Sequence, residues 1–347
     1  MSAAPAQSRI SIGEWVQRQL GIGMGRLPAS LLKRLVTIPV NADGEQMSPE
    51  VAMLMSAIAK APDFSDLSPR EAREAELKDV RIYGERPLPM RLVEELDLPG
   101  GLTATRYRAG TASTGLVVFF HGGGFVLGST AAYDGPLRLL AHHTGMDILS
   151  VEYRLAPEHA FPAPHQDALV AWDYAVKQCP SWGVPADRIV VAGDSSGGNI
   201  AAVLARTLRG SAQEPALQVL MYPATDLAGM RPSRREFADS PALTAKQIEW
   251  FLDLYAPRAL DRADPQASPL LAEDVTGLAP AVVTVAGFDP LRDDGIAYAA
   301  KLADSGVPVE LIREPGLVHG YLGLTALSAT SRDALLRIAA SIVRAMT

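Results

Sequence analysis

The chain has 347 residues, which is long enough for one large α/β domain with insertions or for two domains. Its net charge of −7, with no visible basic stripe, argues against a nucleic-acid partner. The single cysteine, Cys179, excludes an intramolecular disulfide framework and favours a reducing, cytoplasmic compartment.

Local composition argues against three further classes of protein. Met1 to Arg9 are small and polar, and no continuous apolar run follows them, so we expect no secretory signal. The least charged stretch, 109–133, is broken by glycines and indicates a strand and a loop rather than a segment that inserts stably into a membrane. The six histidines show no metal-ligand spacing, so we expect no metal site.

The N-terminal third combines helical and strand-like patterns. Residues 10–60 have apolar side chains at helical spacing and predict amphipathic helices. The capping-box pattern Ser68-Pro69-Arg70-Glu71 predicts the start of another helix. Strand-like segments follow near 79–83, 90–97 and 102–108, and Pro99-Gly100-Gly101 is expected to join the last two as a hairpin.

From residue 115 the pattern changes to strands that alternate with helices. Apolar strands are predicted at 115–120, 146–153, 188–192, 217–222, 281–286 and 307–312. Helices are predicted at 131–143, 165–178, 196–209, 292–305 and about 328–345. Fully apolar strands separated by helices indicate an α/β fold with a mostly parallel central sheet of about eight strands and helices on both faces.

One segment interrupts this alternation and suggests how the chain is divided. Residues 224–270 are rich in charged and helix-forming residues, at a place where one strand should lead directly to the next. We therefore expect 1–60 and 224–270 to form two parts of a helical cap. The core would comprise 61–223 and 271–347.

The most informative motif is Gly193-Asp194-Ser195-Ser196-Gly197-Gly198, which directly follows the strand at 188–192 and opens a helical stretch. Strand, tight turn, serine and helix form the context of a nucleophile elbow. Such a turn holds the serine in strained backbone geometry and lifts its hydroxyl above the sheet. We therefore predict that Ser195 is a catalytic nucleophile.

A serine hydroxyl needs a base and an orienting acid, and in an elbow of this type the acid and then the histidine follow the serine. Five histidines precede Ser195 and only His319 follows it, so His319 is the predicted base. The predicted acid is Asp289, on a tight turn directly after the strand at 281–286. Asp293 and Asp294 remain alternatives, although carboxylates at these positions suit the start of the next helix.

A glycine run predicts the site that stabilises negative charge. Gly122, Gly123 and Gly124 follow the strand at 115–120, and glycine lets backbone N–H groups approach a carbonyl oxygen closely. Together with the N–H of Ser196, these residues are the predicted oxyanion hole.

With these residues identified, the chain resembles the hormone-sensitive-lipase-like branch of the α/β-hydrolases, the bacterial family IV carboxylesterases. The resemblance covers roughly residues 70–345. It rests on five motifs in order: His121-Gly122-Gly123-Gly124-Phe125, Tyr153-Arg154-Leu155-Ala156-Pro157-Glu158-His159, the serine motif, Asp289-Pro290-Leu291-Arg292-Asp293 and His319-Gly320. It implies an α/β-hydrolase fold with a two-part helical cap, a carboxylic-ester hydrolase activity and no cofactor. The chain departs from the family at Ser196, where alanine is usual.

The functional expectation is a serine carboxylesterase that acts on short- to medium-chain esters, with a small-molecule ester as its partner. Phe125, Asp194, Trp250 and Tyr321 are candidate substrate-binding residues. Three alternatives stay open: a hydrolase of amides, lactones or carbamates, a non-catalytic small-molecule-binding protein, and an N-terminal segment that contacts lipid rather than the body. A homodimer is a further possibility in this fold.

Overall fold

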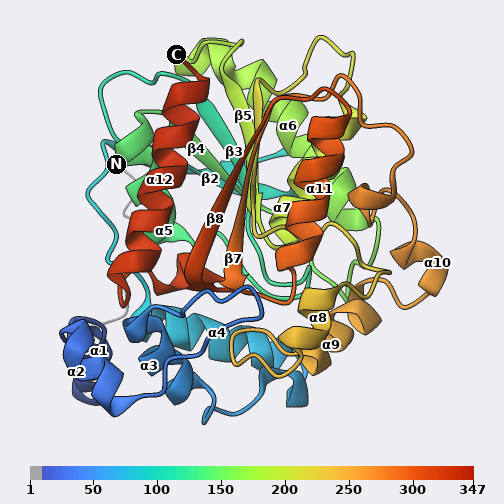
Figure 1. Cartoon of the computed structure of the whole chain (residues 1–347). Coiled ribbons are helices and arrows are strands. Elements are labelled where there is room, and N and C mark those ends of the chain that lie inside the picture. Colours follow the sequence, from blue (N-terminus) through green and yellow to red (C-terminus); the bar gives the residue numbers. More distant parts are fainter. Residues whose placement is uncertain (1–9) are drawn as a thin grey trace.

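The computed structural model describes residues 10–347, and its centre is one eight-stranded sheet (Figure 1). The strand order is β1-β2-β4-β3-β5-β6-β7-β8. β1 pairs antiparallel with β2, β2 pairs antiparallel with β4, and all other neighbours are parallel. The strands are β1 (Leu92–Asp97), β2 (Thr103–Arg108), β3 (Leu116–Phe120), β4 (Asp147–Glu152), β5 (Ile189–Asp194), β6 (Leu217–Met221), β7 (Ala281–Phe288) and β8 (Val309–Val318). The predicted α/β class and mostly parallel sheet are confirmed.

Alternate side chains of the central strands enter two separate cores, one on each face of the sheet. Val118 and Phe120 of β3 belong to the core that contains Trp172, whereas Val117 and Phe119 belong to the other. The first core is covered by α6 (Ala163–Trp182), α7 (Ser196–Thr207) and α11 (Arg292–Asp304), the second by α5 (Asp134–Thr144) and α12 (Ala329–Ala345) (Figure 1). Burial on both faces explains why these strands are apolar throughout.

A layer of helices lies beyond one end of the sheet (Figure 1). It contains α1 (Ile12–Gly25), α2 (Ala29–Leu35), α3 (Pro49–Ile58), α4 (Pro69–Tyr83), α8 (Pro232–Glu236) and α9 (Ala245–Tyr255), and α10 (Ala259–Arg262) follows at its side. The two segments that form this layer meet directly, because Phe64 packs against the rings of Trp250 and Phe251. The Nε2 of Gln247 also donates to Asp63 Oδ1 at 3.0 Å.

Two local expectations are wrong. Residues 79–83 are the last turn of α4, not a strand, because the helix that the Ser68 capping box starts continues to Tyr83 and buries Ala72 and Ile82 on one side. The segment from 314 to 318 is strand rather than loop: β8 continues to Val318, which pairs with Phe288 beyond an irregularity in β7. Pro315 is compatible with this strand because β8 lies at the edge of the sheet.

Among the described helices, none is both long enough and apolar enough to cross a membrane.

Candidate active site

Ser195 lies in the sharp turn between β5 and α7. Its backbone has φ 52° and ψ −116°, which is unusual for a residue with a side chain. The turn brings Gly197 against the backbone of β3, where a Cβ would collide with the carbonyl oxygen of Phe120. The strained serine and the close approach at Gly197 together form the nucleophile elbow that the motif predicts.

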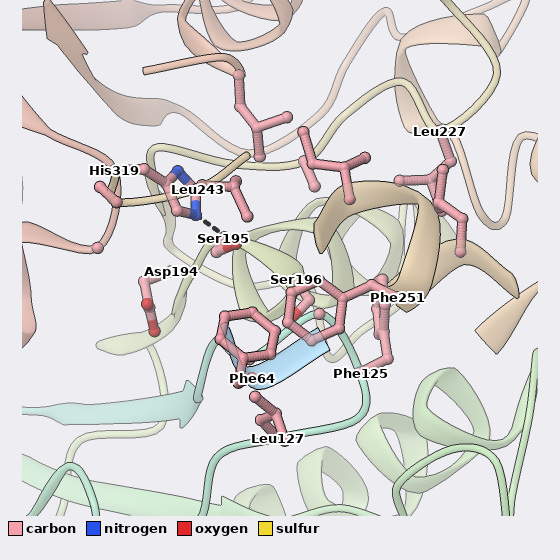
Figure 2. Close-up of a pocket in the computed structure, with 18 of the residues that line it drawn as sticks. Phe64, Phe125, Leu127, Asp194, Ser195, Ser196, Leu227, Leu243, Phe251 and His319 are labelled. Atoms are coloured by element: carbon pink, nitrogen blue, oxygen red, sulfur yellow. Dashed lines mark hydrogen bonds between the residues drawn. The ribbon is translucent and has the colours of Figure 1, made fainter. Parts of the chain in front are cut away.

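The structure brings the three predicted catalytic side chains together. Asp289 follows β7 and His319 follows β8, so both lie at the carboxyl edge of the parallel strands, where β5 also delivers Ser195. The Nε2 of His319 lies 2.9 Å from Ser195 Oγ (Figure 2), and its Nδ1 lies 2.9 Å from Asp289 Oδ2. The buried carboxylate of Asp289 also accepts a hydrogen bond from the Leu291 N–H at 2.7 Å, which fixes its orientation.

The two alternative acids have other partners. Asp293 Oδ2 accepts a hydrogen bond from the Ser233 N–H, and Asp294 pairs with Arg234 at 2.7 Å. Both residues lie in the first turn of α11. Their contacts direct them away from His319 and support the choice of Asp289.

The predicted oxyanion residues separate into two groups. The Gly122 N–H donates to Asp194 Oδ1 at 2.8 Å and also lies 3.1 Å from the hydroxyl of Tyr133, so it is already engaged. No hydrogen bond between residues 10 and 347 uses the N–H groups of Gly123, Gly124 or Ser196, and all three residues line a pocket beside Ser195. These three N–H groups are therefore the donors available to a substrate carbonyl oxygen.

Asp194 connects the elbow to the oxyanion loop rather than facing the substrate alone. Besides the Gly122 N–H, its carboxylate accepts hydrogen bonds from the hydroxyls of Tyr133 at 2.8 Å and Tyr222 at 3.1 Å. Burial raises the pKa of Asp194 to about 6, although these hydrogen bonds favour its ionised form. Its side chain therefore positions Gly122 relative to Ser195.

The pocket has a volume of about 250 Å³. Of the four residues that the sequence suggested for substrate binding, Phe125 and Asp194 line it. Trp250 instead packs edge-on against Phe64 and its neighbour Phe251. Tyr321 is buried, with its hydroxyl 2.8 Å from Thr284 Oγ1.

Comparison with known proteins agrees with this geometry. A family model described as the alpha/beta hydrolase fold matches residues 117–323. The chain belongs to the α/β-hydrolase fold family.

Similar proteins within this family are ester hydrolases by name. The carboxylic ester hydrolase LipN of Mycobacterium tuberculosis is 41% identical over 69% of this chain and 66% of its own length. The ethyl acetate hydrolase of Pseudomonas putida is 38% identical over 83% of this chain and 85% of its own length. The solved structure of a hyperthermophilic esterase from the archaeon Pyrobaculum calidifontis has a TM-score of 0.79 and 37% identity, covering 86% of this chain and 98% of its own.

As in other pockets of α/β folds, the walls come from distant parts of the chain. Sequence reasoning missed several lining residues, which are Phe64, Glu76, Tyr133, Leu227, Arg234, Leu243 and Ile248. Ile248 and Leu252 share a helical face of α9 with Phe251, so their spacing was a usable signal. Glu76 and Arg234 gave none, because each lies in a run of charged residues that resembles a solvated surface.

Within the described part of the chain, no group of three or more His, Cys, Asp or Glu side chains is arranged to hold a metal ion.

Proposed function

We propose that this carboxylic-ester hydrolase cleaves short- to medium-chain esters through an acyl-enzyme formed on Ser195. The observation that carries the proposal is the continuous hydrogen-bonded series from Asp289 through His319 to Ser195 Oγ, with both His319 contacts at 2.9 Å. This is the arrangement that activates a serine hydroxyl for nucleophilic attack.

In the first half of the reaction, Ser195 Oγ attacks the ester carbonyl carbon while His319 Nε2 takes its proton. The carbonyl oxygen becomes an oxyanion, and the N–H groups of Gly123, Gly124 and Ser196 are the proposed donors to it. The carboxylate of Asp289 holds the imidazole and stabilises its protonated form. His319 then returns the proton to the departing alcohol, and a water molecule repeats the sequence to release the acid.

The pocket supports the preference for shorter esters. Its volume of about 250 Å³ is below the range of roughly 300–1,000 Å³ that is typical of sites for drug-sized ligands. Most of its wall is apolar, with Leu227, Leu243 and Phe251 among the side chains. An acyl chain of four to eight carbons is the kind of group that we expect such a pocket to accommodate.

The arrangement of the helices supports a two-part cap. Phe64 and Phe251 come from the two parts, contact each other and line the pocket. Amides, lactones and carbamates remain alternative substrates, because the triad does not distinguish leaving groups. A non-catalytic binding protein is a weaker alternative, since it has no need of the Ser195–His319–Asp289 geometry. A homodimer and a cytoplasmic location also remain predictions, the latter supported by the single, buried Cys179.

The deciding experiment is an assay of p-nitrophenyl esters from acetate to palmitate with the wild type, Ser195→Ala and His319→Ala. We expect saturable hydrolysis that peaks at short or medium chains and falls by about 10⁴-fold or more in kcat in both variants. Circular dichroism would verify that the variants fold. A folded wild type without activity on any ester would overturn the esterase proposal and favour another substrate class.

A further inference from the structure

Arg234 is a buried cation that lines the pocket from α8. Only 7% of its surface is exposed. The other polar side chains of the pocket wall are those of the triad, of Ser196, and of Glu76, Tyr133 and Asp194 beside the oxyanion loop. Arg234 is separate from them: it contacts the backbone of Asp226, next to Leu227. In the view of Figure 2, Leu227 and Asp194 lie on opposite sides of Ser195.

The guanidinium of Arg234 has more donors than partners. Its Nη2 donates to the Asp226 carbonyl oxygen at 2.5 Å and to Asp294 Oδ2 at 2.7 Å. The Nε is buried without a hydrogen-bond partner. Within residues 10–347 no hydrogen bond uses Nη1 either, although a guanidinium offers five N–H donors and buried donors are normally paired. The side chain is therefore anchored by one nitrogen and has free donors at the pocket wall.

The charges around Arg234 indicate which kind of acceptor fits. Arg231 and Arg234 face the carboxylates of Asp226 and Asp294, with Arg231 lying 3.6 Å from the first and 3.5 Å from the second. Two cations and two carboxylates balance, so the cluster does not need an additional anion. A neutral oxygen atom would satisfy the free donors without adding an unbalanced buried charge.

We propose that Arg234 donates a hydrogen bond through Nη1 to an oxygen atom of the substrate other than those of the scissile ester. The preferred substrates are then esters that carry a second, uncharged oxygen function, such as a ketone or another ester group, at the end that reaches α8. This inference rests on the proposed esterase function and names a substrate class for it. Arg234 binds substrate in this scheme and takes no part in proton transfer.

The test compares esters that differ at a single position. Methyl oxoalkanoates from methyl 4-oxopentanoate to methyl 7-oxooctanoate are paired with methyl alkanoates of equal chain length, so that a ketone replaces one methylene group. Each kcat/KM is divided by the rate of alkaline hydrolysis to remove differences in intrinsic reactivity. We expect the wild type to prefer the oxo ester by about ten- to a hundredfold at one or more chain lengths, as for a hydrogen bond to a charged donor.

Two variants identify the donor. Arg234→Met should abolish the preference. Arg231→Met is the matched control, because Arg231 contacts the same two carboxylates but does not line the pocket, and it should retain the preference. Thermal melting would verify folding, and Arg234→Lys, which keeps the charge but loses the forked donors, replaces the methionine variant if that variant does not fold.

Each outcome is decisive. Equal efficiency toward both esters at every length in the wild type overturns the inference, and so does a preference that survives in Arg234→Met. Preference for monomethyl dicarboxylates alone would show that the site takes an anion, contrary to the charge balance. A wild type that hydrolyses no ester would instead overturn the proposed function, which separates the two failures.

Discussion

Ser196, directly after the nucleophile, contributes its backbone rather than its side chain. Its hydroxyl is buried and has no hydrogen-bond partner, whereas its N–H is free beside the pocket. A buried hydroxyl without a partner costs roughly 1–3 kcal/mol of stability. We therefore expect Ser196→Ala to leave kcat unchanged and to keep or raise the Tm, as measured with p-nitrophenyl butyrate and by thermal melting. A large loss of kcat would show that the hydroxyl acts in the reaction.

Gly124 is the residue of the oxyanion loop that tolerates a side chain least. Its φ is 60°, and an added Cβ would overlap the ring of Phe251. Gly124→Ala should displace the loop and lower kcat by about 10²–10³-fold, the usual loss for one oxyanion donor. The control is Gly306→Ala, which has a similar φ of 80° and open space around it. If both variants lose the same activity, backbone strain rather than the clash with Phe251 is responsible.

The sequence identified the three triad residues because chain order left few choices. His319 is the only histidine after Ser195, and Asp289 directly follows a strand. It did not identify the wall of the pocket. Trp250 and Phe251 are adjacent and equally apolar, and only the angle of α9 against η1 (Phe64–Asp66) decides that Phe251 faces the substrate. Such choices depend on tertiary packing, which periodicity does not encode.

At the scale of elements, α4 holds the outer end of the oxyanion loop. The Nε of Arg73 donates to the Val126 carbonyl oxygen at 2.8 Å, and Glu76 Oε2 accepts from the Gly128 N–H at 2.8 Å. Burial raises the pKa of Glu76 to about 7, and the negative charge of Asp194 raises it further, against the opposing effect of the Gly128 hydrogen bond. This helix therefore couples the N-terminal helical layer to the catalytic loop.

The raised pKa of Glu76 predicts how stability depends on pH. Between the ordinary value near 4.5 and about 7, the folded protein binds a proton at Glu76 that the unfolded chain has released, so stability falls as pH rises through this window. Glu76→Gln cannot lose this proton. Its Tm relative to the wild type should therefore rise between pH 5 and pH 8, by an amount on the order of a few degrees.

The matched control is Glu74→Gln on the same helix. Glu74 forms an exposed pair with Arg70, and its side chain is 62% exposed. Its Tm relative to the wild type should stay constant over the same pH range, because exposed pairs contribute little. Parallel pH profiles for the wild type and Glu76→Gln would contradict the role assigned to burial at Glu76.

At the scale of the whole molecule, the repeating order of strands and helices was predictable because burial on both faces makes each central strand fully apolar. The errors lie where that signal is absent. Residues 79–83 alternate polar and apolar side chains as a strand does, yet they complete a helix that begins at Pro69. The contact between Phe64 and Phe251 joins segments almost two hundred positions apart, and nothing local in either segment specifies the other.

The antiparallel extension of the sheet depends on one buried carboxylate. Asp147 of β4 is 1% exposed, and it accepts hydrogen bonds from Arg106 at 2.7 and 2.9 Å and from Arg108 at 2.8 and 2.9 Å, both on β2. Asp147→Asn would leave the buried guanidinium of Arg106 without this counter-charge. Removing one partner of a buried pair costs about 3–5 kcal/mol, so the free energy of unfolding measured with urea should fall by that amount.

Because Asp147 lies at the start of β4 and has no contact with the triad, the loss should fall on stability rather than on chemistry. The kcat of the folded variant at 25 °C should equal that of the wild type. Asp173→Asn provides the comparison, since its pair with Lys177 is exposed and should contribute about 0.5 kcal/mol or less. Equal destabilisation by the two substitutions would mean that solvent reaches Asp147 and that packing of β2, not this charge cluster, holds the edge of the sheet.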